Sequence, residues 1–330
     1  MRVMVTGGAG FIGSHIVDDL VARGHQVVVY DNFSTGLDAN LVHHAGAVEV
    51  IRGDILDQAA LTAAMHGCEI VSHQAAQLEI FLSIRRPEDD LRQNTIGTLN
   101  VLRAAKESGV RKVINASSAC VYGQTTCASR ETDDPTPNWA YGVSKLAAEK
   151  YGRIYSQYEQ LPVVSLRYGI VYGEREWYRR VLPIFLKRVL GGHAPVVFGA
   201  GDQVRDFVYV GDVVRLHRMC MESSAGDGEV FNVGTGRATT IATLASEAGR
   251  LRAPAIAPVF EATEEGQFSR LVPEKKRNAA ELKTMLLNID KARAVYSWEP
   301  EVVLSHGLRR EYEWARANPD RWQSIRYTVT

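Results

Sequence analysis

Tyr141 and Lys145 stand four residues apart in the segment "NWAYGVSKLAAEK", which has the composition of a helix. Residues i and i+4 share one face of a helix, so the phenol and the ammonium lie side by side. A free tyrosine, with a pKa of about 10, is a poor base at neutral pH, but a neighbouring ammonium lowers that pKa. The pair therefore has the chemistry of a general base that accepts a proton from a hydroxyl group. Taken alone, the spacing also fits a solvated helix with no chemistry.

Two serines supply a second group for the same chemistry. Ser117 and Ser118 lie in "NASSACVYG", at the end of the fifth expected strand. In an open α/β sheet, ligands bind outside the carboxyl ends of the strands. A hydroxyl beside Tyr141 can donate to the substrate oxygen and pass protons, and we assign this role to Ser118. Ser117 fits a substrate contact or an ordinary turn residue.

A glycine-rich turn precedes these groups in the chain. The opening "VMVTGGAGFIGSHIVDDL" places Gly7, Gly10 and Gly13 between an expected strand and an expected helix. Such a turn lets the backbone approach a pyrophosphate, and the helix N-terminus offers N–H groups to the anion. Asp31 ends the next expected strand, where a carboxylate accepts hydrogen bonds from both ribose hydroxyls and repels a 2′-phosphate. The sequence therefore predicts NAD rather than NADP, and a tight turn with a solvated aspartate is the weaker alternative.

The elements that must position these residues follow an alternating pattern. Short runs such as "VMVT", "QVVVY", "VEVI", "EIVSH" and "KVINAS" are β-branched and uniformly apolar, as expected for strands covered on both faces. Helical segments, including 12–23, 89–108 and 140–157, lie between or after them. This alternation predicts an α/β fold, a Rossmann-type doubly wound parallel sheet.

The second half of the chain is less regular. Short strands are expected at Val196–Phe198, Phe207–Tyr209 and Val230–Val233, within a smaller mixed α/β substrate-binding domain that sends one strand back to the main sheet. We expect the dinucleotide-binding domain to comprise 1–173, rejoined by about 207–235. The nucleotide-sugar-binding domain is expected to comprise 174–206 and 236–330.

Composition excludes several other classes. The 330 residues are 45% hydrophobic and 23% charged with a formal net charge of zero, which argues against disorder and nucleic-acid binding. No apolar run approaches the ~18 residues of a membrane span. The four cysteines form no C-x-x-C pair and the histidines form no H-E-x-x-H, so no metal site is expected. A cytoplasmic location is the default expectation.

The motifs together resemble the extended short-chain dehydrogenases/reductases, in the branch of the NDP-sugar epimerases and dehydratases. The resemblance covers nearly the whole chain and is carried by the segments "TGGAGFIGSH", "DNFSTG", "RGD", "QAAQ", "NTIGTLNVL", "SSACVYG", "YGVSK", "LRYGIVYG", "DQVRDFVYVGD", "FNVGTG" and "IDKARAVYSWEP". The most similar branch is that of the UDP-glucose and UDP-glucuronate 4-epimerases.

The resemblance implies further site residues. Beside those already named, it assigns to the cofactor Phe11, Ile12, Asn32, Ser34, Thr35, Gly36, Asp54, Ile55, Ala75, Ala76, Gln77, Asn94 and Tyr168. From the residues alone, Asp54 fits a helix cap as well as an adenine contact. The resemblance also implies that Arg205 and Arg277 hold the substrate diphosphate and that Val197 and Phe198 border the nucleotide base.

Departures from the family pattern narrow the chemistry. The 4,6-dehydratases carry an Asp–Glu pair after the catalytic serine or threonine, and this chain has Ala119 and Cys120 there. Without an acid to expel water, C4 epimerisation is expected. An asparagine common in "RYxNVYG" is replaced by Ile170, so one diphosphate contact is lost or moved.

The sequence leaves the roles of two charged residues open. Glu79 either bonds a sugar hydroxyl or pairs with an arginine such as Arg175. Arg175, in "YGEREWYRR", either reaches a hexuronate carboxylate or begins a solvated helix.

The expected function is reversible C4 epimerisation of a UDP-hexose or UDP-hexuronate, through a transient 4-keto sugar and with tightly bound NAD. A 4-keto-sugar reductase or another NAD-dependent dehydrogenase is the alternative, and an inactive cofactor-sensing regulator is more remote. The family implies a homodimer that packs the helices at 89–108 and 140–157 of each subunit into a four-helix bundle.

Overall fold

The computed structural model describes residues 1–176, 180–273, 275–277 and 281–323. Seven parallel strands form the main sheet in the order β11-β6-β5-β4-β1-β2-β3. Their bounds are β1 (Arg2–Thr6), β2 (Gln26–Asp31), β3 (Val48–Arg52), β4 (Ile70–His73), β5 (Lys112–Ser118), β6 (Val163–Tyr168) and β11 (Val230–Val233). The strand order reverses between β1 and β4, which confirms the doubly wound fold class.

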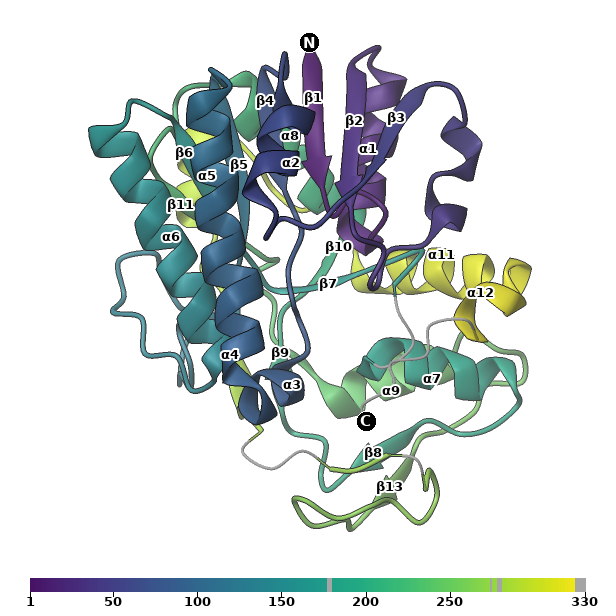
Figure 1. The fold of residues 1–330 in the computed structure, drawn as a ribbon. Coiled ribbons are helices and arrows are strands. Elements are labelled where there is room, and N and C mark those ends of the chain that lie inside the picture. Colours follow the sequence, from purple (N-terminus) through teal and green to yellow (C-terminus); the bar gives the residue numbers. More distant parts are fainter. Residues whose placement is uncertain (177–179, 274, 278–280, 324–330) are drawn as a thin grey trace.

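Helices cover both faces of this sheet (Figure 1). One layer contains α2 (Gln58–Met65), α5 (Gly97–Glu107) and α6 (Ala140–Tyr158), and the other contains α1 (Phe11–Ala22) and α8 (Val210–Glu222). Except for β3, the strands between them are almost wholly buried, so their apolar runs follow from burial on two sides. Among the residues that the structure describes, none of the helices combines the length and apolar character needed to span a bilayer.

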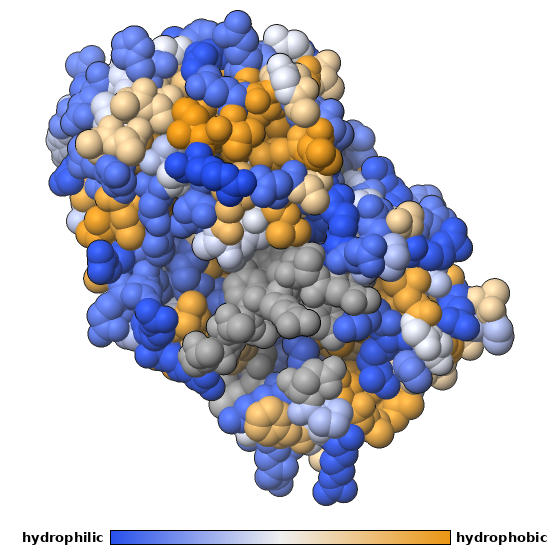
Figure 2. Space-filling model, turned by 45° about the vertical axis from the view of Figure 1, so that its right-hand side comes forward, coloured by the Kyte–Doolittle hydropathy of each residue, from blue (hydrophilic) through white to orange (hydrophobic). Residues whose placement is uncertain are grey.

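The strand β3 departs from the expected burial. It lies at the edge of the sheet and pairs only with β2, and Val50 at its centre is 43% exposed. Val42, in the short helix η2 (Val42–His44) that precedes β3, is 69% exposed. Figure 2 shows apolar side chains gathered on the upper part of the face turned forward, on the side where β3 lies in Figure 1. The prediction that every strand is covered on both faces is therefore wrong for β3.

A smaller set of elements lies beyond the carboxyl ends of the main strands, in the lower half of Figure 1. Its helices are α7 (Val181–Leu190), α9 (Ile241–Gly249), α11 (Leu304–Ala317) and α12 (Pro319–Gln323). Its short strands are β8 (Val196–Phe198), β9 (Val204–Arg205), β12 (Thr239–Thr240), β13 (Val259–Glu261) and β14 (Thr284–Met285). The parallel pair β7 (Ile170–Tyr172) and β10 (Phe207–Tyr209) and the helix α10 (Asp290–Tyr296) complete the chain.

The helix expected over 89–108 is built from three pieces. After α3 (Ile80–Arg85) come α4 (Pro87–Asp90), a π-helical segment η3 (Leu91–Ile96) and then α5. Segments of π-helix inside α-helices are often found at functional sites. Here η3 carries Asn94, whose side chain is 1% exposed.

Candidate active site

A cleft of about 1750 Å³ lies where the carboxyl ends of the main strands face the smaller set of elements. Every residue that the sequence analysis assigned to the cofactor, the substrate or catalysis lines it, except Gly36, Asp54, Asn94 and Val197. The cleft is where an open α/β sheet binds its ligands.

The glycine turn between β1 and α1 has the form of a dinucleotide cradle. Gly7 has φ +68°, and a Cβ there would lie 2.6 Å from the Ala75 nitrogen, while a Cβ on Gly13 would overlap the Gly7 carbonyl oxygen. Gly10 caps α1 without a side-chain hydrogen bond to the helix N-terminus. Only glycine fits this close packing, and the N–H groups at the start of α1 face the cleft for an anion. The turn therefore fits a pyrophosphate.

Asp31 and Asp54 lie beyond this turn. Asp31 Oδ2 accepts from the Ala9 N–H at 2.9 Å and Oδ1 accepts from the Phe33 N–H at 2.8 Å, which fixes the carboxylate at the cleft. Burial raises the pKa of Asp31, and these two hydrogen bonds oppose the rise. Asp54 Oδ2 accepts from Asn32 Nδ2 at 3.0 Å and does not line the cleft. The helix-cap interpretation of Asp54 is wrong, because Asp57 caps α2.

Gly36 and Asn94, which the sequence assigned to the cofactor, do not line the cleft but contact residues that do. Gly36 packs against the Asp31 carboxylate, where a Cβ would lie 3.0 Å from both oxygens. Asn94 Oδ1 accepts from the Gln77 N–H at 2.9 Å, and its Nδ2 donates to the Gln77 carbonyl oxygen at 2.9 Å. Asn94 Nδ2 also lies 3.2 Å from Ser144 Oγ of α6. Asn94 thus joins the Gln77 segment to α6 and does not itself line the cleft, so its predicted part in the cofactor site is to hold the residues that do.

Tyr141 begins the first turn of α6, and its N–H donates to Ser83 Oγ at 3.2 Å. Burial raises the pKa of its phenol above the ordinary value, and hydrogen bonding with Ser118 and the charge of Arg180 act in the opposite direction. The lowering of this pKa expected from the neighbouring Lys145 ammonium is outweighed by burial in the protein without ligands. The spacing of Tyr141 and Lys145 indicates the neighbouring ammonium but not the desolvation of the phenolate.

Lys145 is 4% exposed and lies 6.0 Å from the centre of the Tyr141 ring. Its Nζ donates to the Ala116 carbonyl oxygen at 2.9 Å. Burial lowers the pKa of Lys145 to about 8, while Asp90 and Glu149 act against that fall. A pKa near 8 keeps most of the side chain protonated at neutral pH, so the buried ammonium stays available beneath the phenol.

Ser117 and Ser118 are consecutive residues of β5, so their side chains point to opposite faces of the strand. Ser118 Oγ accepts from the Cys120 N–H at 3.2 Å and interacts with Tyr141. Ser117 Oγ donates to a carboxylate oxygen of Glu149 on the other side of the strand. Ser117 is therefore a strand residue and not a turn residue, and its hydroxyl is directed away from the predicted substrate contact.

Two arginines gather at the far end of the cleft. Arg205 Nη2 lies 3.6 Å from Glu281 Oε1, and both Arg205 and Arg277 act to lower the pKa of Glu281, which burial raises. Arg277 Nη1 donates to the Thr263 carbonyl oxygen at 2.6 Å, and its buried Nε has no hydrogen-bond partner among the described residues. The convergence of two guanidinium groups on one acid fits a site for a diphosphate.

Val197 does not border this site. The residues of β8 alternate, so that Val196 and Phe198 line the cleft while Val197 is fully buried in the core. The predicted contact of Val197 with the nucleotide base is therefore corrected. Ile170 lines the cleft and presents an apolar side chain at the position where the family resemblance implied an asparagine.

Arg175 and Glu79 both line the cleft. Arg175 forms an ion pair with Asp18 of α1 and has its Nη2 3.0 Å from His15 Nδ1. Its guanidinium is thus held by the first helix, which argues against its predicted role with a sugar carboxylate. The Glu79 N–H is bonded by the Gln77 side chain at the start of α3.

Arg180 was not singled out from the sequence, although it belongs to the arginine-rich stretch "YGEREWYRR", of which 177–179 lie outside the described residues. It lines the cleft, and its charge acts on both Tyr141 and Cys120. Arg180 Nη1 donates to the Val171 carbonyl oxygen at 3.1 Å and lies 3.4 Å from Glu176 Oε1. Only the arginine content of this stretch could have indicated Arg180 as a site residue from the sequence.

One group of described residues has the spacing of metal ligands, namely Asp18, His43 and His44. It lies outside the cleft lining, and its Asp18 is already paired with Arg175. A guanidinium at the carboxylate disfavours a cation there.

The strand order, the glycine turn after β1 and the serine, tyrosine and lysine at the strand ends together define a short-chain dehydrogenase/reductase, a Rossmann-fold enzyme that uses a nicotinamide dinucleotide. The chain belongs to the NAD dependent epimerase/dehydratase family, whose model matches residues 3–234. The cofactor is NAD, in agreement with the acid at the end of β2.

Relatives extend the match over the whole chain. A UDP-glucose 4-epimerase of Mycolicibacterium smegmatis is 35% identical over 325 residues, with 96% of this chain and 99% of that protein covered. The crystal structure of the Thermotoga maritima UDP-glucose 4-epimerase with UDP-glucose has a TM-score of 0.87 at 35% identity, covering 97% and 100% of the two chains. That of the Thermus thermophilus UDP-glucose 4-epimerase with NAD has a TM-score of 0.85 at 36% identity, covering 96% and 99%. Other relatives include a decarboxylase and 4,6-dehydratases.

Proposed function

We propose that this protein catalyses the reversible C4 epimerisation of a UDP-sugar through a transient 4-keto sugar. The observation that carries the proposal is the meeting of Ser118, Tyr141 and Lys145 at the cleft, with Ala119 and Cys120 directly after the serine. A general base and a proton donor are present, while the acids that remove water in the 4,6-dehydratases are replaced by an alanine and a thiol. This favours epimerisation over the reactions of the dehydratase and decarboxylase relatives.

Each residue has a definite part in this chemistry. Tyr141 accepts the proton of the sugar 4-hydroxyl, and Ser118 donates to the same oxygen. Lys145 holds the positive charge that stabilises the phenolate as it forms. Gly7, Gly13 and Asp31 would hold the dinucleotide. When bound, NAD supplies the oxidation and reduction at C4.

The substrate is held mainly by its diphosphate. Arg205 and Arg277 supply two guanidinium groups for the phosphate oxygens, and Glu281 competes with them until the substrate binds. A sugar that is held through the diphosphate can rotate as a flat 4-keto species and present its other face. The rotation accounts for inversion at C4.

The sugar itself is either a hexose or a hexuronate, so the candidate pairs are UDP-glucose with UDP-galactose and UDP-glucuronate with UDP-galacturonate. Arg180 replaces Arg175 as the candidate partner of a C6 carboxylate, because its charge reaches Tyr141. The acid Glu176 beside Arg180 has its pKa raised to about 7 by burial, so it opposes that charge only in part at neutral pH.

The test is incubation of the purified protein with UDP-glucose and, separately, UDP-glucuronate, with NMR detection of the C4 epimer. An epimerase gives an equilibrium mixture with no net change at the reduced-nicotinamide absorbance band, whereas a 4-keto-sugar reductase consumes reduced cofactor in proportion to product. Tyr141→Phe should fold, bind NAD and lose about 10²–10⁴-fold in rate. Wild-type turnover by that variant refutes the assignment.

We also propose a homodimer built from α5 and α6, and the division into 1–173 with 207–235 and 174–206 with 236–330. An exposed apolar stripe supports the dimer: Val143 is 53%, Ile154 is 45% and Tyr158 is 77% exposed along α6. Val143, Ile154 and Tyr158 are spaced as on one face of a helix, and such a face packs against a partner helix.

A further inference from the structure

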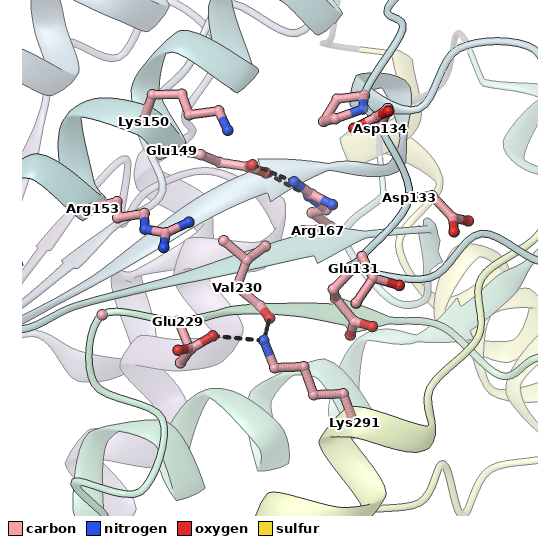
Figure 3. Close-up of a pocket in the computed structure, with 13 residues that line it drawn as sticks. Glu131, Asp133, Asp134, Glu149, Lys150, Arg153, Arg167, Glu229, Val230 and Lys291 are labelled. Carbon is pink, nitrogen blue, oxygen red and sulfur yellow. Dashed lines mark hydrogen bonds and ion pairs between the residues drawn. The ribbon is translucent and has the colours of Figure 1, made fainter.

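A second set of buried charges lies behind the catalytic strand end. Glu149 of α6 and Arg167 of β6 form an ion pair in which Arg167 Nη2 lies 2.7 Å from Glu149 Oε2 and Nε donates to Oε1 at 2.9 Å (Figure 3). Their side chains are only 2% and 5% exposed. The pair lines a separate cavity of about 230 Å³ instead of the cleft, so Glu149 does not face the substrate site.

The pair is the centre of a hydrogen-bond network that joins several elements. Glu149 also accepts from Ser117 Oγ, so one carboxylate connects α6 with β5 and β6. Arg167 Nη1 donates to Tyr122 Oη at 2.7 Å, and Tyr122 Oη donates to Asn232 Oδ1 of β11 at 2.8 Å. The buried network therefore fixes α6 against three neighbouring strands.

Both ends of this network are adjacent to the reacting groups. Glu149 follows Lys145 by one helical turn on α6, and its charge favours the protonated form of that lysine. Ser117, which Glu149 holds, directly precedes Ser118 on β5. The network thus adjoins Lys145 along α6 and Ser118 along β5, while its Glu149–Arg167 pair lies outside the cleft lining.

We propose that Glu149 is a positioning residue of the active site: it locks the Ser118 end of β5 to α6 and places a carboxylate, paired with Arg167, one helical turn from Lys145. The inference rests on the proposed function for its kinetic consequences but not for its physical ones. Asp90 is the other charge that acts on Lys145, so Glu149 and Asp90 share this task.

A merely structural ion pair must be distinguished from this role. Breaking a buried pair by removing one partner is strongly destabilising, whereas replacing both partners by neutral groups of similar volume is often tolerated. The informative pair of variants is therefore Glu149→Gln and the double variant Glu149→Gln/Arg167→Met. The double variant removes the unpaired guanidinium, so its fold and melting temperature should recover towards those of the wild type.

The direct measurement is the pKa of Lys145 in the NAD-loaded protein, by NMR of ¹³Cε-labelled lysine with Lys145→Met for assignment. We expect the pKa to fall by about one unit in Glu149→Gln, which leaves the Arg167 guanidinium unpaired, and to fall by less in the double variant, which removes a negative and a positive charge together; one unit corresponds to a tenfold change in the ratio of the two protonation states. An unchanged Lys145 pKa in Glu149→Gln, measured below its melting temperature, overturns the charge role. This readout does not need turnover, so it stands even if no UDP-sugar is epimerised.

The kinetic measurement is the pH profile of kcat/KM on the UDP-sugar that the wild type converts. The alkaline limb should move to lower pH in Glu149→Gln, with about tenfold loss near pH 9 and a smaller loss near pH 6.5, and should move less in the double variant. A profile of Glu149→Gln that overlays the wild type below its melting temperature reduces Glu149 to a structural residue. Ser117→Ala keeps the charge but removes the link to β5, so it should lower kcat at all pH values without moving the limb; unchanged kcat overturns the strand-holding role.

The matched control is Asp227→Asn. It breaks another ion pair of β5, since Asp227 Oδ1 lies 2.6 Å from Lys112 Nζ at the opposite end of the strand. Lys112 and Ser118 are the first and last residues of β5, so the length of the strand, about 20 Å, separates them. Asp227→Asn should lower the melting temperature and leave the Lys145 pKa and the pH profile unchanged, and a shift of either in this variant contradicts the local role of Glu149.

Discussion

Replacing Gly7 by alanine tests the dinucleotide cradle most directly. The new Cβ would lie 2.6 Å from the Ala75 nitrogen and 2.8 Å from the Ala75 Cα, closer than the 3.0 Å that real Cβ contacts respect. The positive φ of +68° adds the penalty for a left-handed residue, about 1–2 kcal/mol. Overpacking against the backbone adds about 1–3 kcal/mol.

Gly24→Ala separates these two contributions. Gly24 has φ +76° with nothing within 4 Å of the built Cβ, so it carries the conformational penalty without the clash. Both variants should melt below the wild type, and Gly7→Ala should melt lower because it also displaces the Ala75 segment. Only Gly7→Ala should lose NAD, because Gly7 and Ala75 line the cleft and Gly24 ends α1 on the far side.

The assay is the molar ratio of NAD to protein after gel filtration, together with the melting temperature in the presence and absence of added NAD. Gly7→Ala should retain less than a tenth of the NAD that the wild type retains and show a smaller rise in melting temperature on adding NAD. The reasoning is refuted if Gly7→Ala retains NAD like the wild type, or if Gly24→Ala loses it to the same extent.

Three further predictions concern other parts of the molecule. Burial and the neighbouring Glu176 raise the pKa of Glu311 well above 4.5, so the folded state binds the proton more tightly and stability falls as the pH rises. Glu311→Gln should therefore raise the melting temperature at pH 8 but not at pH 4, and calorimetry showing equal effects at both would contradict this. Arg180→Met should lower kcat/KM for UDP-glucuronate about 10–150-fold more than for UDP-glucose, as expected for a charged hydrogen bond of about 1.5–3 kcal/mol; equal losses would exclude a carboxylate contact. Val143→Glu, in the exposed stripe of α6, should give a monomer in light scattering that still binds NAD, and an unchanged mass would argue against that interface.

Local signals predicted much of the fold. The short strands at Val196–Phe198, Phe207–Tyr209 and Val230–Val233 and the helix beginning at Ala140 occur where the sequence indicates them. Strand and helix signals are local, and the doubly wound order follows from their alternation. The exposure of β3 was missed because its position at the edge depends on the partner strands and not on its own residues.

The errors within the site share a physical origin. Ser117 lies on a strand buried on both faces, and Val197 lies on an apolar strand with one face on the cleft and the other on the core, so no polar alternation indicates the direction of either side chain. The raised pKa of Tyr141 reflects desolvation, which the spacing of Tyr141 and Lys145 does not contain. Glu149 looks like an ordinary helix residue in "LAAEK", and its partner Arg167 becomes visible only after α6 packs on β6.

The return of β11 to the main sheet constrains how the chain can be synthesised or divided. β11 pairs with β6 in parallel register from Val230↔Ser165 to Val233↔Tyr168, although some 60 residues of chain separate them. During translation, β6 emerges from the ribosome long before this partner, so one edge of β6 stays unpaired until β11 is synthesised. An unpaired strand edge is a template for mispairing. A recombinant fragment ending near residue 173 would keep that edge open permanently. Excising the NAD-binding unit for engineering therefore requires a graft of β11, for example by circular permutation, and not a simple truncation.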